Sequence, residues 1–120
     1  MKFKIMKYIL LLSLFLSLPV NAQIVSTKIG QIDKMFAYDD YGAVAGRNGS
    51  DIVVWTVTGL AACEHGVWLT PAAPGYSTIT SFLLTAYTTK QKVRFQVYND
   101  IIWKGSTKFN FCQIDSISFE

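Results

Sequence analysis

The sequence predicts a mainly β domain, a small Greek-key barrel with one α-helix, that follows an N-terminal export signal. Three observations lead to this prediction. Segments in which apolar and polar residues alternate lie on both sides of a single segment with helical periodicity. The chain has 120 residues, enough for one small domain after the signal. Two cysteines remain in that domain, as is common in small exported proteins.

The first 22 residues have the pattern of a secretory signal peptide. Three lysines among the first seven residues precede an apolar run over residues 8–18, and small residues follow up to Ala22. The run is too short for a membrane-spanning helix of about 20 residues. We expect cleavage after Ala22, which leaves residues 23–120 as one domain, in the periplasm or outside the cell, without a membrane span.

The charge of this domain excludes one class of partner. The formal net charge of the whole chain is +3, and the three lysines of the signal account for it. Residues 23–120 therefore carry equal numbers of basic and acidic side chains. Because nucleic-acid affinity comes largely from neutralised phosphates, we expect no nucleic-acid partner.

The first half of the domain predicts strands separated by turns. Residues 24–32 are rich in β-branched side chains and predict a strand. Residues 38–42 predict a turn or a short edge strand, and Asn48-Gly49 predicts a hairpin turn. The alternation over residues 51–59 gives the clearest predicted strand, with one buried and one solvent-facing side. One side would carry Val53, Trp55 and Val57, and the other Val54, Thr56 and Thr58.

The second half predicts a short strand, a helix and two further strands. A short apolar stretch, residues 67–69, precedes a proline-rich connector over residues 70–75. The next apolar residues have helical spacing, with Ser77 as the expected cap. They are Ile79, Phe82, Leu83, Ala86 and Tyr87. Strands are then expected over residues 92–98, from residue 101 and over 109–119, with a turn at Asn99-Asp100.

This order of elements fits the OB-fold arrangement, a small Greek-key barrel whose helix covers one end. A sandwich has no natural place for the helix, and a doubly wound sheet needs several helices. Cys63 and Cys112 predict one disulfide in an oxidising compartment. It would join the end of the third strand to the last strand.

Few residues suggest catalysis. Cys63, Glu64 and His65 adjoin, but a disulfide at Cys63 would leave no nucleophile, and we interpret His65 as a loop residue. Asp39-Asp40 is interpreted as a solvated turn. The sequence contains no cluster of zinc ligands and no phosphate-binding glycine loop. We therefore expect no metal, no cofactor and no enzymatic activity.

Recognition is the function class that remains. Sugars are commonly held by an aromatic face together with hydrogen-bonding groups. The domain offers seven candidate rings, at Trp55, Trp68, Trp103, Tyr38, Tyr41, Tyr76 and Tyr98. Tyr41 and Tyr98 lie beside turn residues, so we expect these two to be the most exposed.

Several short motifs resemble a known family. GQID at residues 30–33, VW at 67–68, AYTT at 86–89, QKVR at 91–94 and IW at 102–103 are similar to motifs in the B subunits of subtilase cytotoxin and typhoid toxin, which are pertussis-like AB5 toxins. The resemblance implies an OB-fold lectin that assembles as a pentameric ring, binds sialylated host glycans and carries a toxic A subunit. With Tyr41 and Tyr98, Arg94 of the QKVR motif completes the expected ligand-binding residues.

Three departures from the family bear on the ligand. The family draws a serine and an aspartate of its sugar pocket from a longer segment before GQID, whereas residues 23–29 stand there in this chain. A family cysteine shortly after GQID has no counterpart in Phe36-Ala37-Tyr38. The family's sugar-contacting tyrosine aligns with Val97, and Tyr98 would face the other side of a strand. The fold is implied by the resemblance, but specificity for sialic acid is not.

We therefore carry three functional hypotheses. The leading one is a secreted, non-enzymatic OB-fold protein that binds a glycan or glycoprotein, forms a homo-oligomer and resembles a toxin B subunit. The second is a monomeric periplasmic or secreted protein-interaction domain, such as an inhibitor, with the same barrel. The third is a small hydrolase that uses His65 and an acid.

Overall fold

The computed structural model describes residues 23–120, and the predicted signal peptide lies outside these residues. The described chain forms six strands, one α-helix and one turn of 3-10 helix, η1 (Ala61–Cys63). The strands are β1 (Ile24–Ser26), β2 (Lys34–Ala37), β3 (Ile52–Trp55), β4 (Gly66–Leu69), β5 (Val93–Ile102) and β6 (Phe111–Phe119). The helix is α2 (Tyr76–Thr89). Within residues 23–120, no helix is long and apolar enough to cross a membrane.

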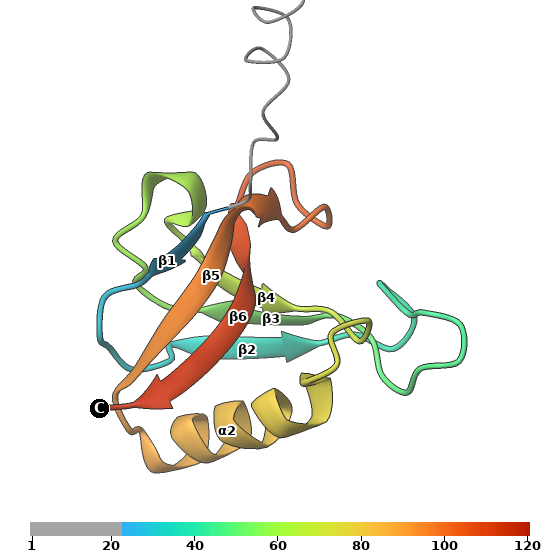
Figure 1. The fold of residues 1–120 in the computed structure, drawn as a ribbon, viewed down its shortest axis with the longest axis horizontal. Coiled ribbons are helices and arrows are strands. Elements are labelled where there is room, and N and C mark those ends of the chain that lie inside the picture. Colours follow the sequence, from blue (N-terminus) through green and yellow to red (C-terminus); the bar gives the residue numbers. More distant parts are fainter. Residues whose placement is uncertain (1–22) are drawn as a thin grey trace, which may run out of the picture.

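The strands form one mixed sheet in the order β1-β5-β6-β4-β3-β2, in which only the β4–β6 pair is parallel (Figure 1). β1 and β2 follow each other along the chain and form the two opposite edges of the sheet, where β1 pairs with β5 and β2 pairs with β3. Between them, the Gly30 N–H donates to the Val93 carbonyl at 3.0 Å and the Lys28 N–H donates to the Thr58 carbonyl at 2.9 Å. This stretch therefore brings the two edges together. The predicted mainly β fold with one helix is confirmed.

The helix lies across one end of the sheet, beneath β2 and β6 in Figure 1. Its buried residues, Leu83 and Ala86, pack into the main core, while Phe82 and Tyr87 of the predicted apolar face stay partly exposed. The prediction that Ser77 caps the helix was wrong. The helix begins at Tyr76 after Gly75, and no side chain caps its first turn.

The prediction that one side of β3 faces solvent was also wrong. Val54 lies in the main core, whereas Val53 points to the other side and packs with Trp103 and Phe111 in a second cluster. Trp103 covers this outer side of the sheet by packing in that cluster, and its backbone N–H donates to the Phe111 carbonyl at 2.9 Å. The strand ends at Trp55, and Val57 beyond it is exposed.

Two more strand predictions need correction. The strand expected over residues 24–32 is three residues long, although Thr27 and Gly30 still donate hydrogen bonds to β5 beyond its end. The strand β2 was not predicted. The expected turn at Asn99-Asp100 lies inside β5. Tyr98 pairs with Gln113 and Ile102 pairs with Cys112, so residues 99–101 form a bulge between consecutive partners. A bulge accommodates turn-forming residues without ending the strand.

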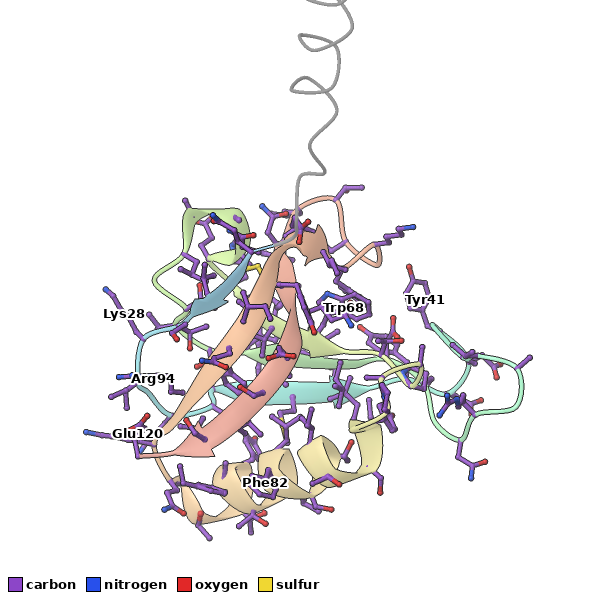
Figure 2. The ribbon with its side chains drawn as sticks, in the orientation of Figure 1. Lys28, Tyr41, Trp68, Phe82, Arg94 and Glu120 are labelled. Atoms are coloured by element: carbon purple, nitrogen blue, oxygen red, sulfur yellow. A yellow bond between two sulfur atoms is a disulfide. The ribbon has the colours of Figure 1, made fainter. Side chains whose placement is uncertain are left out.

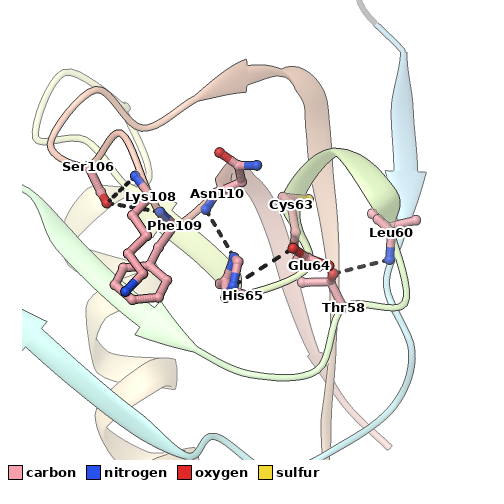
Figure 3. Close-up of polar contacts among 9 residues, drawn as sticks. All are labelled: Thr58, Leu60, Cys63, Glu64, His65, Ser106, Lys108, Phe109 and Asn110. Carbon is pink, nitrogen blue, oxygen red and sulfur yellow. Dashed lines mark hydrogen bonds and ion pairs between the residues drawn. The ribbon is translucent and has the colours of Figure 1, made fainter.

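The predicted disulfide joins Cys63 and Cys112, whose Cα atoms are 5.3 Å apart. Both cysteines are fully buried. Cys63 lies in η1 rather than at the end of a strand, so the bond attaches this short helix to β6. Thr58 steadies the same turn, because its hydroxyl donates to the Cys63 carbonyl at 2.6 Å and accepts from the Leu60 N–H at 3.1 Å (Figure 3).

Candidate functional site

The long loop between β2 and β3 is attached to the barrel at its base. The Tyr38 N–H donates to the Asp51 carbonyl at 3.2 Å, and the Asp51 N–H donates to the Tyr41 carbonyl at 3.0 Å. The Tyr76 hydroxyl, at the start of α2, donates to the Ser50 carbonyl at 2.6 Å. Gly42 has a φ of 78° and lies so close to the Asp51 carboxyl group that a Cβ atom would overlap it. These contacts therefore hold the base of the loop in one conformation over Asp51.

A hollow of about 460 Å³ opens between this loop, β4 and the end of β5. We call it the Tyr41 hollow. The lining residues that bear on ligand binding are Tyr41, Gly42, Asp51, Trp68, Trp103 and Lys104. Figure 2 shows Tyr41 on the loop and Trp68 on the barrel at this end of the molecule. Ligand sites of proteins are typically hollows of about 300–1,000 Å³ with apolar walls and a few polar groups. This hollow has that size and that lining.

Asp51 is the polar group at the centre of the lining. Its side chain belongs to a residue that is only 5% exposed, and the Trp103 indole N–H donates to Oδ2 at 2.9 Å. Within the described residues, no hydrogen bond reaches Oδ1. Burial raises the pKa of Asp51 above its ordinary value, and the hydrogen bond from Trp103 offsets part of this effect. Oδ1 is thus an acceptor without a protein donor that solvent or a ligand can reach, in a side chain that burial has partly desolvated.

The aromatic rings of the hollow are held in place by their neighbours. The Trp103 ring centre lies 5.6 Å from that of Tyr41 and 5.6 Å from that of Tyr38. The Trp68 indole N–H donates to the Ile101 carbonyl at 3.1 Å. Tyr41 is 46% exposed, so part of its ring is open to solvent. The hollow therefore combines fixed aromatic surface with a buried carboxylate.

The three residues that we expected to bind a ligand do not form one site. Tyr41 lines the hollow described above. Tyr98 lines a separate hollow of about 370 Å³ beside the start of α2, and Arg94 lies on the outer face of β5. The Arg94 Nε atom is 3.6 Å from Oε1 of Glu120, a surface ion pair near the end of β6 (Figure 2).

Tyr98 is engaged by a neighbouring acid. Its hydroxyl donates to Oδ1 of Asp115 at 2.8 Å. This hydrogen bond, together with the negative charge of Asp115 and some loss of hydration, raises the pKa of Tyr98 above its ordinary value. The hydroxyl already has its acceptor, so Tyr98 offers a ligand less hydrogen-bonding capacity than the free Oδ1 of Asp51.

Asp51 was missed by the sequence reasoning, which treated it as the first residue of a strand. The one available signal was an acidic residue leading directly into the apolar run Ile52-Val53-Val54. Trp68 and Trp103 were among the candidate rings, but nothing in their spacing places them beside Asp51 or Tyr41. Only the bulge in β5 and the path of the loop bring these residues together.

His65 has a packing role. Its Nδ1 accepts from the Asn110 N–H at 3.1 Å (Figure 3). Its ring packs against those of Trp55 and Phe109. The neighbouring Cys63 is in the disulfide and supplies no free thiol. Asp39-Asp40 lies exposed in the loop, and the described part of the chain contains no group of three metal-ligating side chains.

Comparison of the chain with protein-family models, with curated proteins and with solved structures finds no match.

Proposed function

We propose that the chain is a secreted or periplasmic, non-enzymatic binding protein that holds a glycan in the Tyr41 hollow. The observation that carries this proposal is the pairing of the unpartnered Asp51 Oδ1 with the exposed ring of Tyr41, in a hollow of about 460 Å³. A sugar ring has an apolar C–H face that packs on an aromatic ring and hydroxyl groups that donate to a carboxylate. The hollow presents both kinds of contact side by side.

The topology supports an OB-fold for this protein. An OB-fold is a five-stranded, partly open Greek-key barrel. If β1 and β2 count as two halves of one bent strand, the chain has five strands, and that bent strand pairs with β5 on one side and β3 on the other. The helix between β4 and β5 covers one end, as in the arrangement that the toxin B subunits imply.

A glycan array tests the proposal with the mature chain, residues 23–120, in its oxidised form. We expect binding to a defined set of glycans, and loss of that binding in Tyr41→Ala. Tyr87→Ala is a matched control, because Tyr87 is 43% exposed against 46% for Tyr41 but lies on α2, outside the hollow. No binding to any glycan, or equal loss in both variants, would contradict the proposal.

We further propose that the protein self-associates, as the B-subunit resemblance implies. Several apolar side chains on its surface would be covered in an assembly. Leu84 of α2 is 61% exposed and Val57 is 68% exposed, and the rings of Phe82 and Phe119 pack together at the surface with centres 5.4 Å apart.

Native mass spectrometry of residues 23–120 reads the assembly state directly. A discrete pentamer supports the toxin-type ring and makes an A subunit a reasonable partner to seek. A monomer contradicts self-association and favours the alternative function, a stand-alone protein-interaction or inhibitor domain.

A further inference from the structure

The charge inside the Tyr41 hollow determines which sugars it can accept. We propose that the hollow selects an uncharged sugar that donates adjacent hydroxyl groups to Asp51, and that it disfavours sialylated sugars. This inference rests on the proposed function and names the substrate class of the same site. It departs from the sialylated ligands of the toxin B subunits that the chain resembles.

Asp51 is arranged to accept hydrogen bonds from such a sugar. An ionised carboxylate is an acceptor only, with about four lone-pair sites on its two oxygens. The Trp103 indole N–H occupies one site on Oδ2 at 2.9 Å, which holds the carboxylate in place. Oδ1 takes no hydrogen bond from the described residues. Two neighbouring hydroxyl groups of one sugar can therefore donate to sites that the protein leaves open, without displacing a protein donor.

The same carboxylate opposes an anionic ligand. A sialic acid carries its own carboxylate, which would enter the hollow beside the negative charge of Asp51. Protein covers most of the Asp51 side chain, so water and salt screen this repulsion less than they would between two fully exposed charges. The ligand carboxylate would also displace water from Oδ1 without supplying a hydrogen-bond donor, which costs free energy.

One positive charge also borders the hollow, and it acts differently. Asp51 and Lys104 are the charged side chains in the lining, as far as the described residues go. Lys104 is exposed, so its ammonium is hydrated and screened by salt. It can donate to a sugar hydroxyl at the rim. Its attraction for a carboxylate is weaker than the repulsion from the buried Asp51, so the hollow as a whole favours neutral sugars.

The test compares neutral and sialylated ligands on the same protein. Residues 23–120 are titrated at pH 7 and 0.15 M salt with methyl glycosides of galactose, glucose and mannose, and with the methyl glycoside of sialic acid, by calorimetry. We expect at least one neutral glycoside to bind about tenfold more tightly than the sialic acid, because a charge-assisted hydrogen bond contributes about that much or more. Equal or tighter binding of sialic acid would overturn this inference and leave the proposed function standing. Binding of none of these sugars, and of no glycan on the array, would overturn the proposed function itself.

Asp51→Asn assigns the selectivity to this residue. The variant keeps the size of the side chain and an oxygen that can accept from Trp103, but it removes the charge. We expect neutral-sugar affinity to fall about tenfold or more and the preference over sialic acid to disappear. Asp33→Asn is the matched control, because Asp33 is an exposed carboxylate that does not line the hollow. An unchanged preference in Asp51→Asn would overturn the inference, and circular dichroism of both variants confirms that each is folded.

Discussion

Gly42 holds the loop against Asp51, and its substitution tests the described geometry of the hollow. Gly42 and Gly46 have the same φ, 78°, in the same loop. A Cβ atom at Gly42 would overlap the Asp51 carboxyl group, whereas a Cβ at Gly46 would meet nothing within 4 Å. Gly46→Ala is therefore a control that shares the backbone strain of Gly42→Ala but lacks the steric conflict.

Backbone strain and steric conflict determine how much stability each variant loses. Both variants carry the strain of an L-residue in the left-handed region, about 1–2 kcal/mol. Gly42→Ala must in addition displace its neighbour. Overpacking costs about 1–3 kcal/mol, and rotation of Asp51 away from the new methyl group would break its charged hydrogen bond from Trp103, about 1.5–3 kcal/mol. We expect Gly42→Ala to be less stable than Gly46→Ala by about 1–3 kcal/mol on either path.

Urea unfolding followed by tryptophan fluorescence measures this difference. With a slope of about 1–3 kcal/mol per molar urea, the midpoint of Gly42→Ala should lie clearly below that of Gly46→Ala. Glycan affinity should fall in Gly42→Ala alone, because only there is Asp51 displaced. Equal midpoints and equal affinities in the two variants would refute the close packing of Gly42 on Asp51.

Three further predictions concern stability. Burial raises the pKa of Asp51 in the folded protein, so the folded protein binds a proton more readily than the unfolded chain does. The free energy of unfolding should therefore fall as the pH rises from about 4, the pKa in the unfolded chain, through the raised pKa of the folded protein. Asp51→Asn should lack this component in urea midpoints measured at several pH values. Reduction of the Cys63–Cys112 disulfide, which spans 49 residues, should cost about 4 kcal/mol in the chain-entropy description, read from urea midpoints with and without reductant. Leu83→Ala should cost about 2–5 kcal/mol because Leu83 is 1% exposed. Leu84→Ala, next to it and 61% exposed, should change thermal unfolding little.

Each of these predictions has a contradicting result. The pH prediction is wrong if Asp51→Asn and the unsubstituted protein show the same pH dependence. A reductant that leaves the urea midpoint unchanged would show that the disulfide adds nothing to stability. Equal destabilisation by the two leucine substitutions would contradict the placement of α2, because only Leu83 faces the core.

The elements with the strongest periodicity could be predicted from the sequence. The helix was found because its apolar residues recur with helical spacing, even though its threonines favour other structures. Four of its five threonine hydroxyls instead donate to carbonyls four residues earlier, as Thr80 does to Tyr76 at 2.6 Å. The disulfide was predictable because the predicted signal peptide led us to expect export, and two cysteines in an oxidising compartment usually pair.

The site could not be predicted, because long-range packing creates it. The sequence shows Asp51 at the start of a strand and Trp103 after a turn-like Asn99-Asp100, without any sign that they meet. In the structure the bulge in β5 keeps the strand running past those turn-forming residues, and Trp103 then lies over the outer side of β3. Local patterns carry no information about such a contact between residues 52 positions apart. Tyr41 was correctly predicted to be exposed, because it lies within turn residues. The same prediction for Tyr98 was wrong, because Asn99-Asp100 continue the strand β5 and leave Tyr98 half-buried, whereas Tyr38 is 40% exposed.

The most direct test of glycan binding in the Tyr41 hollow is a nuclear magnetic resonance titration of the indole N–H groups. The three tryptophans of the chain give one such signal each. Trp68 and Trp103 line the hollow, whereas Trp55 packs against Phe109 outside it. On addition of the glycan that binds best, the signals of Trp68 and Trp103 should shift while that of Trp55 stays in place. A shift of the Trp55 signal alone, or no shift of Trp68 and Trp103 at saturating glycan, would contradict binding in the hollow.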